Sequence, residues 1–411
     1  MENIQDNDVA ILRDLAKHQQ EIANSPANLA LVKEWEEHNS FRGKRPMVYL
    51  ETGTLEQELI PPLLKCEGPE ARKIESNLWH NMLNHVLIGD DSPVIDHYSV
   101  SQRFSFALFG LRLAVTHDYP ESGQPEYLEQ FYKDPRKFKK STFAMDKKGE
   151  AAELAQAQEL FGDILPSRVE HGCVNVIPLR LVAHLIGIKN LYISMGDHPD
   201  KLKQLMKRVT EDVESYFRVM EKEKLITPTS DCQRIFQGSF CCTTELPKEI
   251  GAKPLTTKDV WGYMDSFETL GVSPDAFGEF FFPYLKSLAS NFTHLSYGSD
   301  EPVNEIWEKY ISAIPSVKKV SISYHCDEKF MGKKLRGKNV IYNRKPKPEF
   351  LLAETLDEDA IKAHIKTTLD AAKGCKLEIT QRGIGTVNGD ITKAKRYVAL
   401  IRETIEESWK G

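Results

Sequence analysis

Several features are missing from this sequence, and each absence narrows the class of protein. Its 411 residues contain no apolar run long enough to cross a bilayer. The net charge is -6, so no basic excess indicates a nucleic-acid partner or an anionic membrane surface. The first residues are acidic and polar, unlike a secretory signal peptide. We therefore expect a soluble, cytoplasmic protein that binds neither nucleic acid nor membrane.

Motifs that would assign chemistry directly are also missing. The sequence has no Cys-x-x-Cys pair for a structural zinc ribbon, no glycine-rich phosphate loop and no Gly-x-Ser-x-Gly nucleophile turn. Its 7 cysteines are odd in number and widely scattered. In a cytoplasmic protein this pattern predicts reduced thiols rather than a disulfide framework.

Short β-branched runs that end in ionisable residues recur along the chain. The clearest runs from Val317 to Asp327, and helical patterns separate successive runs. We expect about eight such units, the number that closes a (β/α)8 TIM barrel with its reactive groups at the carboxyl ends of the strands. The strands are expected near Val48, Val94, Val176, Ile226, Thr293, Val320, Val340 and Leu377.

The domain organisation follows from the same patterns. Residues 1–45 carry apolar residues at helical spacing and predict an N-terminal helical extension, which would cap the barrel or join two subunits of a homodimer. Residues 46–411 form the expected α/β barrel. Leu113 to Gly149 is polar and broken by prolines and glycines, which favours a surface excursion or lid, and Val260 to Leu270 predicts a helix.

Four runs in the second half of the chain resemble a known family. They are Ser-Ile-Ser-Tyr-His-Cys-Asp-Glu-Lys-Phe-Met-Gly at 321–332, Tyr-Asn-Arg-Lys-Pro-Lys-Pro at 342–348, Gly-Cys-Lys-Leu-Glu at 374–378 and Gly-Asp-Ile-Thr-Lys at 389–393. Together they resemble the uroporphyrinogen decarboxylase superfamily, in the branch of corrinoid-dependent methyltransferases of the O-demethylase methyltransferase I type. The resemblance implies a TIM barrel with its pocket at the carboxyl ends of the strands.

The resemblance also implies an activity. A methyl group would move from a small methylated substrate, such as a methoxylated aromatic, to the cobalt of a corrinoid (cobalamin) carried by a partner protein. Glu51-Thr52-Gly53-Thr54 stands where the tetrapyrrole decarboxylases carry an arginine motif, and Gly383 to Gly389 lacks the cysteine of the thiol-activating methyltransferases. The alternatives are a decarboxylase of a small or tetrapyrrole carboxylic acid and a non-catalytic corrinoid- or ligand-binding module.

Glu301 and Asp327 are the candidate catalytic residues. Glu301 follows a strand and precedes Pro302, which disfavours helix at Glu301 and is expected to hold it at the barrel mouth. A carboxyl among other acids there would stay protonated and donate to a departing oxygen. Asp327 precedes a helical pattern, so helix capping explains it equally well.

Six further residues are candidates for substrate binding. They are His97, Tyr98, Asp231, Tyr297, Arg344 and Arg382. Arg344 would hold a carboxylate of the substrate or the phosphate of the corrinoid, and a solvated loop is its ordinary alternative. The alternative role for Arg382 is a structural salt bridge with Glu378 or Glu301 inside the barrel. The alternative for His97 is a histidine at the rim whose hydrogen bonds are satisfied within the protein.

A zinc ion is a further expectation, with Cys326, His325 and Glu301 as its ligands. A thiolate and a carboxylate at a strand end would leave an open position for substrate. Neighbours on a regular strand point to opposite faces, so His325 joins Cys326 only if the strand has already ended. The alternative for Cys326 is an ordinary buried thiol.

Overall fold

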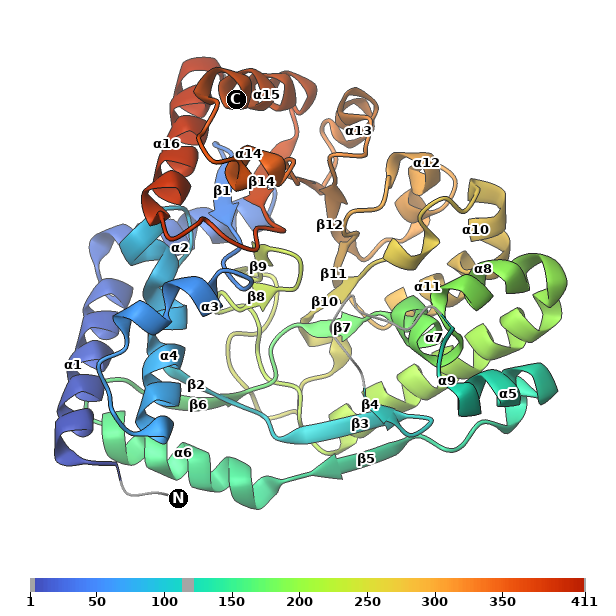
Figure 1. The fold of residues 1–411 in the computed structure, drawn as a ribbon, viewed down its shortest axis with the longest axis horizontal. Coiled ribbons are helices and arrows are strands. Elements are labelled where there is room, and N and C mark those ends of the chain that lie inside the picture. The colour runs from blue at the N-terminus through green and yellow to red at the C-terminus, as the bar shows by residue number, and fades with distance from the viewer. Residues whose placement is uncertain (1–3, 113–121, 410–411) are drawn as a thin grey trace.

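A parallel seven-stranded sheet forms the centre of the computed structural model, which describes residues 4–112 and 122–409 (Figure 1). The strands lie in the order β1-β14-β13-β12-β11-β10-β7, and each neighbouring pair is parallel. They are β1 (Met47–Leu50), β7 (Val174–Val176), β10 (Trp261–Met264), β11 (His294–Tyr297), β12 (Val317–Ile322), β13 (Ile341–Arg344) and β14 (Lys376–Gln381). No strand of the described residues joins β1 to β7, so the barrel-like sheet stays open there.

Helices surround this sheet, and smaller sheets lie beside it (Figure 1). The helices are α1 (Asp6–Ala23), α2 (Pro26–Asn39), α3 (Glu56–Leu59), α4 (Pro69–Leu83), α5 (Pro125–Lys133), α6 (Lys147–Phe161), α7 (Pro178–Ile186), α8 (Ile188–Asp197), α9 (Pro199–Lys222), α10 (Pro274–Phe280), α11 (Phe282–Ala289), α12 (Asn304–Trp307), α13 (Glu328–Leu335), α14 (Glu349–Leu352), α15 (Glu358–Ala371) and α16 (Ile391–Ser408). The other strands are β2 (Tyr98–Ser101) with β6 (Ser167–Glu170), β3 (Phe104–Leu108) with β4 (Leu111–Arg112) and β5 (Thr142–Met145), and β8 (Arg234–Ile235) with β9 (Ser239–Phe240).

The two faces of the central sheet differ in chemistry because side chains alternate along a strand. Val320, Ile322, Tyr342 and Ile379 are buried on the face that packs against the helices and belong to the main apolar core. The intervening residues of the same strands are polar and equally buried: Lys319, Ser321, Asn343, Glu378 and Thr380. The inner face therefore requires polar partners.

The hairpin of β8 and β9 supplies those partners. The carbonyl oxygen of Gly238, at its tip, accepts hydrogen bonds from Asn343 Nδ2 at 3.0 Å and Thr380 Oγ1 at 3.2 Å. Gly238 has a φ of 82°, and a Cβ there would lie 2.4 Å from Thr380 Cγ2, so the position requires glycine. The hairpin thus occupies the inner face of the sheet, as its central place in Figure 1 also indicates.

The open edge of β1 is satisfied by carboxylates instead of a neighbouring strand. Asp90 Oδ2 accepts a hydrogen bond from Leu50 N at 2.8 Å, and Asp91 Oδ2 accepts one from Val48 N at 2.7 Å. These side chains cap backbone donors that would otherwise be unpaired. The strand predicted near Val94 is therefore wrong: the main sheet has no strand there, and β2 begins only at Tyr98.

Other sequence predictions also need correction. No strand forms near Ile226, and Val260 to Leu270 is not a helix but β10 followed by the 3-10 turn η5 (Phe267–Thr269). Within Leu113 to Gly149, expected to be a surface excursion or lid, residues 113–121 lie outside the described part, and the remainder contains α5, β5 and the start of α6. The helices α1 and α2 confirm the helical character predicted for the N-terminal residues.

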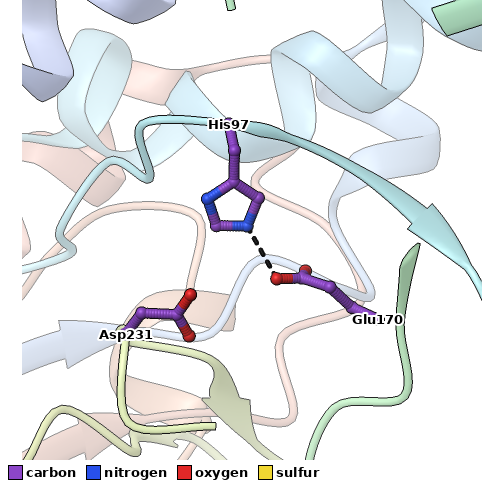
Figure 2. Close-up of side chains that lie close together, drawn as sticks. All are labelled: His97, Glu170 and Asp231. Carbon is purple, nitrogen blue, oxygen red and sulfur yellow. Dashed lines mark ion pairs between the residues drawn. The ribbon is translucent and has the colours of Figure 1, made fainter. Parts of the chain in front are cut away.

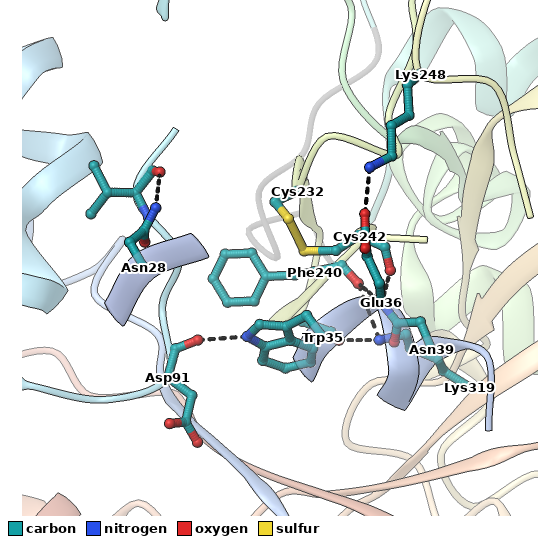
Figure 3. The surroundings of a disulfide bond; sticks show 12 residues. Asn28, Trp35, Glu36, Asn39, Asp91, Cys232, Phe240, Cys242, Lys248 and Lys319 are labelled. Atoms are coloured by element: carbon teal, nitrogen blue, oxygen red, sulfur yellow. Dashed lines mark hydrogen bonds and ion pairs between the residues drawn. A yellow bond between two sulfur atoms is a disulfide. The ribbon is translucent and has the colours of Figure 1, made fainter. Parts of the chain in front are cut away.

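The prediction that all cysteines are reduced is also wrong, because Cys232 and Cys242 form a disulfide (Figure 3). The hairpin brings together two residues that are 10 positions apart, and Trp35 of α2 packs against Phe240 beside them. Among the described residues, no helix is long and apolar enough to span a membrane.

Loss of this disulfide should destabilise the protein by about 2–3 kcal/mol, because the bond closes a short loop in the unfolded chain. The free energy of unfolding of Cys232→Ser/Cys242→Ser, measured in urea against the oxidised protein, checks this. Cys375→Ser is the control, since Cys375 is a buried free thiol. Equal midpoints for the double variant and the oxidised protein would contradict a stabilising disulfide.

Candidate functional site

Ionisable side chains collect at the carboxyl ends of the central strands, because parallel strands end at one edge of a sheet. We call this set the rim cluster. It consists of Glu51 after β1, Tyr263 on β10, Asp265 and Glu268 after β10, Asp300 and Glu301 after β11, Lys345 after β13, Arg382 after β14, and Arg180 from α7.

Arg382 forms the more accessible part of the rim cluster. Its Nη1 lies 2.8 Å from Asp300 Oδ2, and its Nε lies 3.3 Å from Glu51 Oε2. The side chains of Glu51 and Asp300 are 23% and 26% exposed, so this ion-paired group is open to solvent. Arg382 does form salt bridges, as the structural alternative predicted. Their partners are Asp300 and Glu51, so the predicted partners Glu378 and Glu301 are wrong.

The buried part of the rim cluster is a group of acids around Asp265. Tyr263 donates a hydrogen bond from its hydroxyl to Asp265 Oδ2 at 2.6 Å, and Arg180 lies between Asp265 and Glu268 at 3.4 and 3.3 Å. Glu301 accepts hydrogen bonds from Ser266 N at 2.9 Å and Ser299 N at 2.8 Å. Glu301 is 3% exposed, so it lies beneath the rim rather than open at the barrel mouth.

These buried groups hold protons differently from free side chains. Burial, with the charge of Asp265 added, raises the pKa of Glu301 to about 7 and that of Glu268 to about 8. Burial, with the charge of Arg382 added, lowers the pKa of Lys345 to about 7. The rim cluster therefore contains weak acids that are partly protonated near neutral pH, a property common at catalytic sites.

The residues that follow β12 do not form the predicted metal site. Cys326 Sγ lies 3.6 Å from Ser323 Oγ and 3.7 Å from the backbone oxygen of Glu301, while His325 is exposed. Burial raises the pKa of the Cys326 thiol, which disfavours the thiolate form that binds zinc. In the described part of the chain, the ligand atoms of Cys326, His325 and Glu301 do not converge within 4.8 Å.

Asp327 caps a helix. Its Oδ1 accepts a hydrogen bond from Phe330 N at 2.9 Å at the start of α13, and the side chain is otherwise exposed. The catalytic role considered for Asp327 therefore has a sufficient structural alternative.

Asp327→Ala should lower the free energy of unfolding by about 1 kcal/mol and leave turnover unchanged, because it removes one helix cap. Thermal melting and an activity assay on the same preparation measure both effects. A large loss of turnover in a fully folded variant would restore Asp327 to the reaction.

Three of the predicted substrate-binding residues have structural surroundings instead. Tyr98 packs on Phe161 with ring centroids 5.2 Å apart, and Tyr297 shares a hydrogen bond with Ser266 Oγ at 2.7 Å. Arg344 lies 2.7 Å from Glu328 and donates to the backbone oxygens of Ile322 and Ser323, at the end of β12.

The structure does bring together His97 and Asp231, in a second group with Glu170 (Figure 2). One ligand atom from each of the three lies within 4.8 Å of the others, and His97 Nε2 lies 2.8 Å from Glu170 Oε1. Burial lowers the pKa of His97, but its contacts with Asp96 and Glu170 outweigh burial and raise that pKa to about 9. This group is separate from the rim cluster in its residues and in the strands that position them.

Sequence reasoning missed Tyr263, Asp265 and Glu268 because their segment was assigned to a helix. The run from Trp261 to Met264 followed by Asp265 carries the same strand-then-acid signal as the other units. Arg180 and Glu170 had no local signal, since their roles depend on contacts with distant segments.

Comparison with known proteins adds little to this geometry. No protein-family model matches the chain, and no curated protein matches its sequence. Among solved structures, a methyltransferase from Methanosarcina mazei is similar with a TM-score of 0.48 and 16% identity, over 91% of this chain and 98% of that chain. Values this low define neither a family nor an activity.

Proposed function

We propose that this protein is an enzyme that transfers a methyl group from a small methylated substrate, such as a methoxylated aromatic, to the cobalt of a corrinoid carried by a partner protein. The observation that carries the proposal is the set of weak acids at the carboxyl ends of the strands, with the pKa of Glu301 near 7 and that of Glu268 near 8. The sequence resemblance at residues 321–348 supplies the type of chemistry.

Methyl transfer from an ether requires an acid. The methyl carbon–oxygen bond breaks as the cobalt substrate provides the electron pair for the new bond, and the departing oxygen needs a proton. Glu301 is suited to hold that proton because burial and the charge of Asp265 raise its pKa to about 7, and this outweighs the backbone donors of Ser266 and Ser299, which hold the carboxyl group in place but favour its ionised form. Asp265, which accepts a hydrogen bond from Tyr263, would add the negative charge that keeps the carboxyl group of Glu301 protonated.

Substrate binding is assigned to the accessible part of the rim cluster. Arg382, balanced by Asp300 and Glu51, would orient a carboxylate or phenolic oxygen of the substrate. Phe236 of the hairpin lies beside Tyr263 with ring centroids 5.2 Å apart and would offer an apolar contact to an aromatic ring.

A zinc ion at Cys326 does not fit these surroundings. Its sulfur contacts a hydroxyl and a backbone carbonyl oxygen, neither of which is a second strong ligand for zinc. We therefore derive no step through zinc at the rim. In the proposed reaction the reacting metal arrives with the partner protein.

The proposal is tested with purified protein, a cobalt(I) corrinoid protein and a panel of methoxylated aromatics. Formation of methyl-cobalt, followed by its absorbance, together with the demethylated phenol, is the expected result. Release of CO2 from a carboxylic acid without corrinoid would identify a decarboxylase instead. Tight corrinoid binding without either reaction would identify a binding module.

A further inference from the structure

The group of His97, Glu170 and Asp231 borders a large cavity. This cavity has a volume of about 660 Å³ and lies among α2, β6 and the segments around Val94 and Thr227. Glu170 and Asp231 line it, together with Asp96. Glu170 also lines a second cavity of about 270 Å³, so the group stands where two cavities adjoin.

We propose that His97, Glu170 and Asp231 bind one divalent transition-metal ion at the wall of the larger cavity. Figure 2 shows that the imidazole and the two carboxylates, from three separate segments, point toward one another. One nitrogen and two carboxylate ligands suit Zn²⁺ or Mn²⁺. The ligand atoms lie within 4.8 Å of one another, a spacing that a single ion can bridge with small side-chain movements.

The surroundings of His97 favour a ligand role. The residue is fully buried, and its Nδ1 lies 3.0 Å from Asp96 Oδ1. A carboxylate on one ring nitrogen fixes the orientation of the imidazole and leaves the other nitrogen for a metal, as in carboxylate–histidine–metal arrangements. His97 Nε2 is the atom that faces Glu170 Oε1, at 2.8 Å.

Each of the two carboxylates is also held in place through one oxygen, and its other oxygen remains available as a metal ligand. Ser99 Oγ donates a hydrogen bond to Glu170 Oε2 at 2.5 Å, which leaves Oε1 toward His97. Arg168 donates to Asp231 Oδ2 at 3.0 Å. Asp231 Oδ1 is buried and accepts no hydrogen bond from the described residues, an unsatisfied state that a metal ion would relieve.

Two further contacts hold the segments together. Gln19 donates from its side-chain amide to the backbone oxygens of Ile95 and His97 at 2.9 and 3.0 Å. The disulfide of Cys232 fixes the chain directly after Asp231 (Figure 3). Such support is what a rigid metal site requires.

The charge of the group is consistent with a divalent ion. Without a metal, protonated His97 and the guanidinium of Arg168 balance the two carboxylates; on binding, a divalent ion would displace the proton from Nε2 of His97 and supply that charge instead. Three protein ligands would leave coordination positions open toward the cavity, as catalytic zinc sites do. The expected additional ligand is water or an oxygen atom of a small molecule in the cavity.

This proposal does not depend on methyl transfer, since it concerns different residues. The test uses the full chain, freed of metal by a chelator and titrated with ZnCl2 or MnCl2 alone in a calorimeter. We expect about one ion per chain and a melting temperature that rises with the ion concentration.

Variants of the chain then distinguish a defined metal site from non-specific binding of the ion to acidic side chains. Asp231→Asn should weaken metal binding by more than ~10²-fold, and Asp96→Asn, which alters the support of His97 and removes an ion pair with Arg168, by ~10–100-fold. Glu249→Gln is the matched control, because Glu249 lines the same cavity outside the group and its loss should change nothing.

Two results would overturn the metal site. One is a wild-type protein that binds neither ion, which would make the group an ion-pair network of protonated His97. The other is equal binding by wild type, Asp231→Asn and Asp96→Asn. Both substituted side chains are partly exposed at 22% and 60%, so folded variants are expected, and melting without metal verifies this.

Discussion

Glu301→Gln should lower the rate of methyl transfer by ~10²-fold or more, the usual effect of losing a general acid. The amide cannot supply the proton that the carboxyl group holds when burial raises its pKa to about 7. The loss should appear in kcat rather than in KM, because the proton is needed when the carbon–oxygen bond breaks. Single-turnover formation of methyl-cobalt by the variant and the wild type measures it.

The substitution also has a structural cost that must be separated from chemistry. Both carboxylate oxygens of Glu301 accept backbone hydrogen bonds, from Ser266 and Ser299, and an amide nitrogen cannot accept one of them. A loss of about 1–3 kcal/mol in stability is therefore expected. Rates are compared per folded protein, and Asp327→Ala is the control. A folded Glu301→Gln variant with full turnover would contradict the assignment.

Lys319→Met should destabilise the protein by about 3–5 kcal/mol, because it leaves Glu378 buried without its partner. Lys319 Nζ lies 2.6 Å from Glu378 Oε1, and both side chains are at most 1% exposed. The same ammonium group donates to Ser239 Oγ and to the backbone oxygen of Phe240, at 2.6 and 3.1 Å. Its loss therefore weakens the attachment of the hairpin to the sheet as well.

The free energy of unfolding in urea, measured for Lys319→Met and Lys318→Met, checks this result. Lys318 is the neighbour on β12 and is only partly buried, so its substitution should change stability by less than about 0.5 kcal/mol. A double variant, Lys319→Met/Glu378→Leu, should recover part of the loss because it removes both buried charges. Equal stabilities for the two single variants would show that the buried pair does not support the fold.

The parts of the fold that the sequence predicts are those with strong local patterns. The strand at Val317 is confirmed as β12, and the strands near Thr293, Val340 and Leu377 are confirmed as β11, β13 and β14. Leu202, Leu205, Met206 and Val209 have helical spacing along the chain and form a buried apolar stripe of α9. In each case one segment contains the whole signal.

The errors occur where the outcome depends on distant segments. Val260, Tyr263, Met264, Phe267 and Leu270 have helical spacing, yet the neighbouring strands β7 and β11 make the first part a buried strand. The segment near Val94 is β-branched, but the carboxylates of Asp90 and Asp91 already occupy the edge of β1. No single-sequence window contains these contacts.

The residues of the candidate site that the sequence predicts are likewise those with a local signal, and the missed ones depend on distant segments. Glu301 was found because it follows a strand by a short turn, and Arg382 because it lies at the end of the last strand; parallel strands end together. Asp265 was missed with its strand, and Glu170 was missed because its partner His97 lies 73 positions earlier and their contact depends on the fold. The disulfide was missed because only the hairpin brings Cys232 beside Cys242.

The pH dependence of single-turnover methyl transfer tests the central claim most directly. A carboxyl group with a pKa of about 7 donates its proton only while protonated, so the rate should be high below pH 7 and fall as the pH rises through about 7. The corrinoid protein is kept saturating so that the rate reports the chemical step. Methyl-cobalt formation that falls with rising pH in the wild type, and loses this fall in Glu301→Gln, is the predicted result. A rate that is constant or rises across this range, or no methyl-cobalt at any pH, would contradict the account.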